Sequence, residues 1–437
     1  MNSIEKKIPQ TRWLRIIPIL FFANVVCWID KSVLSYAVPA GMAKDLGLSG
    51  SVVGLLGTVF SIGYLFLQMP GSSMAAKGKC KKPLALTMAG WAVVIYLLGS
   101  STTATEALIY RFILGVFEGA VYPALVTLIA NWFPNDERAR ATSMFLASAS
   151  TSQIIMGPTV SIILLNNDWR TLFHFASVVS AILVVFWLIF LSERPEDAKW
   201  LSEAERNYLI EKFKADKANQ KAGEKAPLLE VIKNINVWKI SIMYFGLSMG
   251  TLGFAFWLPT LVKTITKTGM TQTGLLSAIP NIGVLIGVLS MGFISDKTQK
   301  RKLFAGVCPM IFTGLLVVAM LCQSSPWLSF GIICMAGLFL QGAAPNMWAM
   351  VGQLLTPEEA GTARGFINSW SNIGGMVAPL MIGFITDVTG NQILTWSVVF
   401  GFSVLSFLIS LTLPKHLNGK MKTKSNVEDA NVKEELA

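Results

Sequence analysis

The fold is decided by residues 110–141, YRFILGVFEGAVYPALVTLIANWFPNDERARA, where an arginine and a glutamate interrupt an apolar run. As an α-helix, residues 110–130 would rise about 30 Å, the thickness of a bilayer's hydrocarbon core. Arg111 and Glu118 stand seven residues apart and emerge on nearly the same stripe, beside Gly115 and Gly119, where a neighbouring helix can approach closely. A charge at mid-membrane costs on the order of 2.5 to 3.5 kcal/mol and usually marks a water-lined pathway or a proton relay. The stretch predicts a membrane-spanning helix with a functional charged face; an ion pair that only ties helices together is the alternative.

The whole chain has the composition of a polytopic membrane protein. Of its 437 residues, 53% are hydrophobic and only 14% are charged, and the mean hydropathy is +0.56, which a soluble domain of this length could not bury consistently. We therefore expect an all-α membrane protein with twelve transmembrane helices. The twelve apolar runs lie at about residues 16–38, 50–75, 84–103, 107–131, 141–165, 171–191, 237–262, 273–294, 303–323, 327–354, 363–385 and 392–413.

Basic residues gather in alternate loops, as the positive-inside rule predicts for a membrane protein. The main clusters are Lys6, Lys7, Arg12 and Arg15 before the first run, Lys77, Lys79, Lys81 and Lys82 after the second, and Lys297, Lys300, Arg301 and Lys302 after the eighth. The net charge of +11 therefore reflects topology and implies no nucleic-acid partner. We expect a multi-pass protein of the cell (inner) membrane with both termini in the cytoplasm.

The charged run ends in NWFPNDERARATS, where Pro134 cannot continue the helix and two arginines follow. The pair YRFILGVFEGAVYPA and WFPNDERARA resembles the fourth span and following loop of the anion:cation symporter family in the major facilitator superfamily, in the branch that carries sugar acids and other organic anions. The resemblance extends from about residue 12 to residue 414. It implies a major facilitator fold, with two six-helix halves around a central cavity.

An internal duplication agrees with two halves built on one plan. Punctuating residues recur at nearly one offset: Pro39 and Pro259 (220), Gly71 and Gly292 (221), Pro134 and Pro357 (223), Pro158 and Pro379 (221). Such a parallel repeat is typical of transporters whose halves rock about a central site. We expect a cytoplasmic N-terminus (1–15), a first half (16–191), a cytoplasmic linker with an amphipathic surface helix (192–236), a second half (237–413) and a disordered cytoplasmic tail (414–437).

The loops after the second and eighth spans differ in charge. In the superfamily this loop normally carries an acidic residue. The second half has Asp296 there, whereas the first-half stretch GSSMAAKGKCKK has Ala76 at the matching place. The same stretch also lacks the glycine and hydroxyl residues of a phosphate-binding loop. The resemblance implies a gating role for loop residues Asp296, Lys297, Arg301, Arg138 and Arg140.

The charged residues that lie deep inside the spans belong to the first half. Asp30 and Lys31 lie in the first span, where the family most often has arginine second; a lysine keeps the charge but loses the two-pronged grip on a carboxylate. A membrane-embedded cation suits an anionic ligand, and a carboxylate there can take and release a proton. We therefore expect Arg111, helped by Lys31, to hold the substrate's carboxylate, and Glu118 and Asp30 to carry protons.

The second half offers neutral polar and aromatic groups instead. Resemblance to the sugar-acid carriers favours Asn346, Trp348 and Asn368 as substrate-binding residues, with Tyr64 and Gln153 from the first half. Hydrogen bonding between helices is an equally good explanation for any single asparagine here.

The chemistry expected is binding and transport, not catalysis. Five scattered cysteines and two distant histidines supply no disulfide framework, metal cluster or catalytic triad, so we expect no enzyme activity, no metal and no cofactor. The sequence predicts a secondary active transporter that imports a small organic anion, first of all a sugar acid, by proton symport. The expected partners are the anion, protons and the lipid bilayer, with the protein a monomer. The alternatives are an anion exchanger and a transport-like nutrient sensor.

Overall fold

The computed structural model describes residues 10–219, 227–414 and 417, and all regular elements of this part are helical. In the first half these are α1 (Thr11–Ala37), the π-helical η2 (Val38–Met42), α2 (Ala43–Asp45), α3 (Gly50–Phe66), α4 (Gln68–Ala76), α5 (Lys81–Gly99), α6 (Ala104–Gly119), α7 (Val121–Trp132), α8 (Asn135–Ile163) and α9 (Trp169–Phe190). The linker holds η3 (Pro195–Asp197) and α10 (Glu203–Asn219). The second half holds α11 (Leu228–Lys233), α12 (Ile235–Thr266), α13 (Met270–Thr298), α14 (Arg301–Leu321), α15 (Pro326–Leu340), α16 (Ala344–Leu354), α17 (Pro357–Thr389) and α18 (Gln392–Leu411).

Helices occupy each of the twelve expected spans. Eleven stretches of the described residues are long and apolar enough to cross a membrane. The remaining span is α8, whose 29 residues suffice in length but begin with NDERARATS and include many small polar residues, which lowers its hydropathy. The prediction of an all-α fold with twelve transmembrane helices is confirmed.

Two spans are broken at equivalent places in the two halves. The fourth span changes from α6 to α7 at Ala120, and the tenth changes from α15 to α16 across residues 341–343. Ala120 and Gln341 differ by 221, the same offset as the repeated glycines and prolines. The internal duplication therefore includes these two breaks, and discontinuous spans are typical of transporter binding sites.

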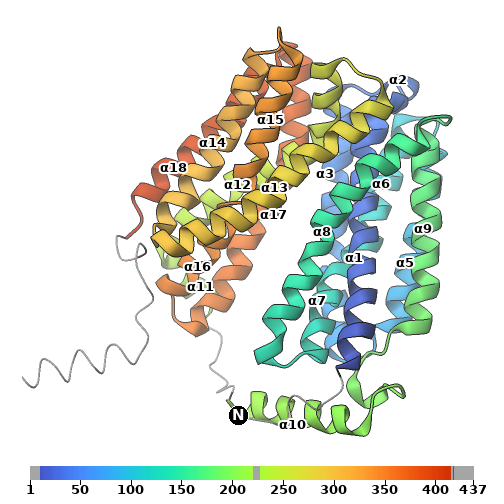
Figure 1. Ribbon diagram of the computed structural model, residues 1–437, viewed down its shortest axis with the longest axis vertical. Coiled ribbons are helices and arrows are strands. Elements are labelled where there is room, and N and C mark those ends of the chain that lie inside the picture. Colours follow the sequence, from blue (N-terminus) through green and yellow to red (C-terminus); the bar gives the residue numbers. More distant parts are fainter. Residues whose placement is uncertain (1–9, 220–226, 415–416, 418–437) are drawn as a thin grey trace, which may run out of the picture.

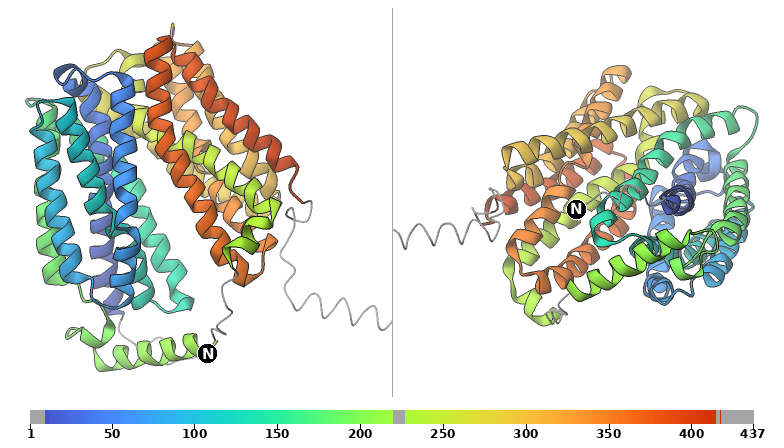
Figure 2. Two further views of the ribbon diagram at one scale, coloured as in Figure 1. Left: turned by 180° about the vertical axis from the view of Figure 1, so that it is seen from behind. Right: turned by 60° about the horizontal axis from the view of Figure 1, so that its bottom comes forward.

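The two halves meet at one end of the molecule and diverge at the other. In Figure 1 the ribbons of the first half (blue to green) and the second half (yellow to red) lie close together at the end away from α10 and spread apart toward α10. Figure 2 shows the same divergence from behind. Hydrogen bonds across this closed end join α3 to α17 and α8 to α13, including Thr58 Oγ1 to the Met376 carbonyl at 2.8 Å and Ser161 Oγ to the Thr271 carbonyl at 2.6 Å.

The linker helix α10 is fixed to the first half by a buried ion-pair cluster. Arg12, at the start of α1, donates to Glu205 on α10 at 2.7 Å and to Glu137 on α8 at 2.6 Å. Arg12 is 1% exposed and Glu205 is fully buried. Beside the cluster, the rings of Trp132 and Trp200 stack with centroids 5.3 Å apart. The helix expected at the surface of the linker therefore packs against the ends of the first-half helices, as Figure 2 shows in its right-hand view.

Candidate functional site

The candidate site is built on a close contact between α3 and α6, which three glycines make possible. A methyl group added to Gly115 would lie 2.1 Å from the Phe60 carbonyl oxygen, and one on Gly119 would lie 2.2 Å from that of Tyr64. On α3, a methyl group on Gly63 would lie 2.3 Å from the Phe112 carbonyl oxygen. The two backbones therefore touch, as the small residues of the sequence predict, and residues of α6 lie beside the aromatic face of α3.

Arg111 is buried at this contact. Its side chain is 2% exposed, and its Nε donates to the Leu56 carbonyl in α3 at 3.4 Å. The guanidinium carbon lies 4.6 Å from the centre of the Phe60 ring, a favourable cation–π distance. Nη1 has no hydrogen-bond partner. The guanidinium is thus held by α3 on one side but keeps a donor for a further acceptor.

Glu118 is 1% exposed, and neither of its carboxyl oxygens has a hydrogen-bond partner. Lys31 and Arg111 both lie close enough to interact with it electrostatically. A buried polar group without a partner is uncommon and calls for an explanation such as a transient ligand or a mobile proton. Its position next to the helix break at Ala120 adds to the case for a functional role.

Asp30 and Lys31 are adjacent in α1 but contact different neighbours. Asp30 is fully buried and accepts a hydrogen bond from Ser180 Oγ in α9 at 3.0 Å, while its Oδ1 has no partner. Lys31 is only half-buried, and its Nζ lies 4.6 Å from the centre of the Tyr64 ring and 5.3 Å from that of Trp28. Of the two cations near the site, Lys31 is therefore the one more open to a ligand.

The neutral residues expected to bind substrate have varied surroundings. Gln153 is half-buried and donates to Ser32 Oγ at 2.9 Å. Asn346 is 4% exposed; its amide donates to the Gly342 carbonyl at 2.9 Å, and its oxygen accepts from Ser295 of α13. Asn346 therefore ties α16 to α13.

Trp348 and Asn368 lie in other surroundings. The rings of Trp348 and Tyr244 lie 4.9 Å apart, and Asn368 is exposed on α17. In the conformation seen, Asn368 is the most accessible second-half residue of the set, while Asn346 spends its polar atoms on helix–helix contacts.

The residues expected to take part in gating lie toward the end where the halves diverge. Arg138 Nη2 lies 3.4 Å from the Ala130 carbonyl oxygen, and the guanidinium carbon of Arg140 lies 4.9 Å from the centre of the Trp13 ring. Lys297 is exposed and Arg301 is half-buried, while the side chain of Asp296 lies outside the described residues.

The loop after the second span has alanine where the second half has Asp296. Offsets of 220 and 221 pair Asp296 with Ala76 and Ala75. Ala75 is fully buried, and its carbonyl accepts a hydrogen bond from Asn131 at 2.9 Å. The Ala76 carbonyl accepts from Arg194 at 3.2 Å. The first-half loop is thus held by backbone contacts at both positions.

Three residues of the site were not anticipated from the sequence. Trp28 and Phe60 face the cations, and their spacings to Lys31 and Tyr64, three and four residues, are those of side chains sharing a helix face. That spacing is a signal that could have found them. Ser180, the partner of Asp30, carries no such signal because it lies 150 residues away in the sequence.

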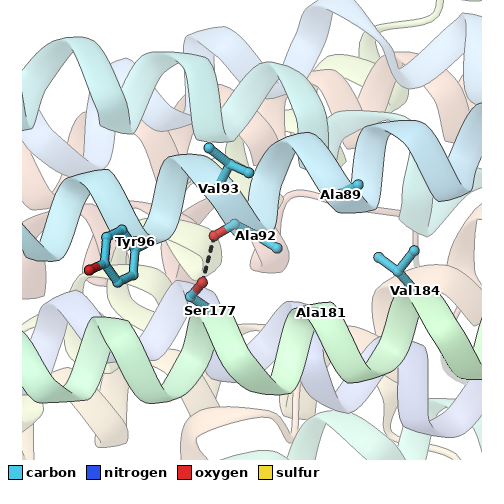
Figure 3. A pocket seen from close by; sticks show the side chains of 7 residues that line it. All are labelled: Ala89, Ala92, Val93, Tyr96, Ser177, Ala181 and Val184. Atoms are coloured by element: carbon cyan, nitrogen blue, oxygen red, sulfur yellow. Dashed lines mark hydrogen bonds between the residues drawn. The ribbon is translucent and has the colours of Figure 1, made fainter.

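A separate pocket lies on the outer wall of the first half, between α5 and α9 (Figure 3). It is lined by Ala89, Ala92, Val93, Tyr96, Ser177, Ala181 and Val184. Ser177 Oγ donates to the Ala92 carbonyl at 2.8 Å, and Val93 is 60% exposed. Asp30, Lys31, Arg111 and Glu118 do not line this pocket. Its apolar, outward-facing wall fits contact with lipid.

Comparisons with known proteins agree with the fold and with transport. The family model of the Major Facilitator Superfamily matches residues 20–379 and 266–431. A protein of Agrobacterium vitis whose name assigns it tartrate transport is 29% identical over 429 residues, covering 95% of this chain and 96% of that protein. The hexuronate transporter of Bacillus subtilis is 25% identical over 418 residues, covering 93% and 96%.

Among solved structures, a bacterial homologue of the human lysosomal transporter Spinster, in an inward-facing and unoccupied conformation, superposes with a TM-score of 0.71 at 15% identity, covering 95% of this chain and 100% of that one. At that identity the likeness concerns the fold. The relatives are membrane transporters, which confirms the prediction that this chain is a transporter and not an enzyme.

Proposed function

This chain belongs to the Major Facilitator Superfamily, and we propose on that premise that it imports a small organic anion, first of all a sugar acid, by proton symport. The observation that carries the proposal is the group Asp30, Lys31, Arg111 and Glu118. It combines two cations with two buried carboxyl groups, each of which has at least one oxygen without a hydrogen-bond partner. Relatives named for tartrate and hexuronate support an acidic substrate.

The substrate's carboxylate is proposed to bind Lys31 first, because that ammonium group is the more accessible cation. The unpaired Nη1 of Arg111 would then supply a second donor from deeper in the protein. Tyr64, Gln153, Trp348 and Asn368 would contact hydroxyl groups or the carbon chain. Asn346 could join them only by giving up its hydrogen bonds to Gly342 and Ser295.

Protons are proposed to travel on Glu118 and Asp30, whose carboxyl groups have unpaired oxygens close to the cations. An electrical argument supports symport. Moving one net charge across 100 mV is worth about 2.3 kcal/mol, so a proton that accompanies each anion removes a penalty against entry. Substrate and proton would thus share one charged region, as coupling requires.

The proposed orientation puts α10 and both termini in the cytoplasm of a cell (inner) membrane protein that acts as a monomer. The positive-inside pattern supports it, and the structure would then be closed outside and divergent inside. A cysteine replacing Asn219 on α10, in a background without the native cysteines, should be shielded from an impermeant thiol reagent in intact cells. Labelling from outside would overturn this orientation.

The decisive experiment is uptake into proteoliposomes across a panel of radiolabelled sugar acids, with and without an imposed pH gradient. Symport predicts accumulation driven by an inward proton gradient. The competing function is anion exchange, and rapid counterflow with no proton-driven uptake would favour it. Binding without any transport would favour a nutrient sensor.

A further inference from the structure

The hydroxyl group of Ser180 in α9 has one hydrogen and two acceptors within reach. Ser180 is fully buried, and its Oγ lies 3.0 Å from Asp30 Oδ2 and 2.8 Å from the Ala176 carbonyl oxygen. A hydroxyl group carries a single hydrogen and two acceptor lone pairs, and it rotates to suit its surroundings. Ser180 can therefore donate fully to only one of these oxygens at a time.

Both protonation states of Asp30 find a hydrogen-bond partner in Ser180. When Asp30 is charged, the hydroxyl hydrogen of Ser180 points at Oδ2. When Asp30 carries a proton on Oδ2, that O–H donates to Ser180 Oγ, and the hydroxyl hydrogen turns to the Ala176 carbonyl. The distances of 3.0 and 2.8 Å suit O–H···O bonds in either direction. A proton can thus be gained or lost by rotating one hydroxyl group, without moving a helix.

Trp91 of α5 is a second neutral donor beside Asp30. It is fully buried, and its Nε1 has no hydrogen-bond partner among the described residues. The indole N–H lies close enough to the carboxyl group of Asp30 to interact with it. Because α9 packs against both α1 and α5, all of these groups belong to the first half. We therefore expect them to move as one body when the two halves move relative to each other.

Charged and titratable groups of α1 and α6 also act on Asp30. Glu118 and Arg111 of α6 interact with it electrostatically, as does Cys27, one turn earlier in α1. The Nζ of Lys31 lies instead beside aromatic rings of α3. The donors from α5 and α9 differ from these groups because they are neutral. Removing the hydroxyl of α9 therefore changes the hydrogen bonding of Asp30 without changing any charge around it.

We propose that Ser180 is a positioning residue for proton exchange at Asp30, giving its hydrogen to the charged carboxylate and to the Ala176 carbonyl when the carboxyl group is protonated. This inference rests on the proposed function in one respect, that Asp30 carries a proton. A hydrogen bond to a charged group is stronger than one to a neutral group. Ser180 therefore favours the charged form, and without its hydroxyl Asp30 should release the proton only at a higher pH.

Infrared difference spectroscopy of the full-length protein in liposomes tests this role without any substrate. The pH is stepped, and the carbonyl stretch of the protonated acid is assigned to Asp30 by its absence in Asp30→Asn. Ser180→Ala should move the midpoint of this band to higher pH by about one unit, because it removes a hydrogen bond to the charged form. It should also shift the band, since the acid's O–H loses its acceptor.

Ser177→Ala is the matched control. Ser177 lies on the same helix and donates to the Ala92 carbonyl at 2.8 Å, so its loss should leave the midpoint unchanged. Ser180→Thr keeps a hydroxyl and should restore the wild-type midpoint; if it does not fold, the comparison of Ser180→Ala with Ser177→Ala decides. Equal midpoints in Ser180→Ala and wild type would overturn the role of Ser180 alone. A wild-type Asp30 that does not titrate would overturn its proposed role as a proton carrier, and the role of Ser180 with it.

Discussion

The ring of Phe60 lies against the guanidinium of Arg111, with 4.6 Å between the guanidinium carbon and the ring centre. Lys31 Nζ lies 6.0 Å from the centre of the same ring. One aromatic side chain of α3 therefore contacts both cations proposed to bind substrate, and it helps to keep Arg111 at 2% exposure. Under the proposed function, a ligand's carboxylate would meet the half-buried Lys31 before the more deeply buried Arg111.

Arg111→Ala should abolish binding of the acid. Truncating one member of a buried, hydrogen-bonded charge pair typically costs about 2 to 5 kcal/mol in affinity. Arg111→Lys should also bind poorly, because an ammonium group cannot reproduce the planar fork that contacts Leu56 and Phe60. Equilibrium binding of a labelled sugar acid to purified protein measures both. Neutral sugars of the same size should not compete, and equal competition by a neutral hexose would contradict a carboxylate grip.

Lys31→Gln should weaken binding by about tenfold or more, since it removes the accessible cation. Lys31→Arg should keep most of the affinity, because a guanidinium also stacks on the aromatic rings of Trp28 and Tyr64. The exposed Lys267 at the closed end supplies the control, and Lys267→Gln should bind normally. The measurement is the concentration dependence of uptake. Wild-type affinity in Lys31→Gln would mean that Arg111 alone binds the carboxylate.

The sequence was sufficient to predict the spans, the internal duplication and the charged residues buried in the spans of the first half. Hydropathy and glycine spacing are local properties, and Gly115 and Gly119 indicated the close approach of a neighbouring helix before the structure supplied α3 as that neighbour. Contacts between distant segments were beyond it. Nothing near Ser180 indicates that it donates to Asp30, and nothing near Asp387 indicates that it caps α3, 336 residues away. The roles of the site residues stay predictions.

The buried cluster around Arg12 predicts a large effect on stability. Glu205→Ala removes one of the two carboxylates that pair with a guanidinium 1% exposed, and breaking such a buried pair typically costs about 3 to 5 kcal/mol. The melting temperature in detergent should fall clearly. The matched control is Asp136→Asn, which breaks the more exposed pair with Lys212 and should cost less than about 1 kcal/mol. Equal melting temperatures for the two variants would show that the buried pair stabilises the protein no more than the exposed pair does.

The stability contributed by the Asp136–Lys212 pair should depend on pH in a defined direction. A hydrogen bond from Lys212 lowers the pKa of Asp136 below its usual value. A group whose pKa is lowered by folding stabilises the protein above the unfolded pKa, and this contribution is lost as the pH falls through the folded pKa. The difference between wild type and Asp136→Asn should therefore be present at neutral pH and vanish in acid.

The last prediction separates the proton site from the substrate site, and it rests on the distance between Glu118 and Arg111 along α6. Seven residues rise about 10 Å along a helix axis, so we expect a carboxylate bound at Arg111 to leave Glu118 outside direct contact. Neither oxygen of Glu118 has a partner, so Glu118→Gln, which mimics the protonated state, breaks no existing hydrogen bond. The variant should bind the acid and exchange it when both sides of the membrane contain substrate, because the loaded carrier can still reorient.

Net uphill accumulation by Glu118→Gln should fail, since the permanently neutral side chain has no proton to release inside and the empty carrier cannot return by the normal route. Counterflow and pH-driven uptake should therefore be measured on one preparation, with Asp30→Asn in parallel. Full pH-driven accumulation by Glu118→Gln would remove Glu118 from the coupling mechanism and leave Asp30, with its unpaired Oδ1, as the main candidate. Loss of counterflow together with pH-driven uptake would instead indicate that the charge of Glu118 is needed to keep Lys31 and Arg111 in place, because both cations interact with it electrostatically.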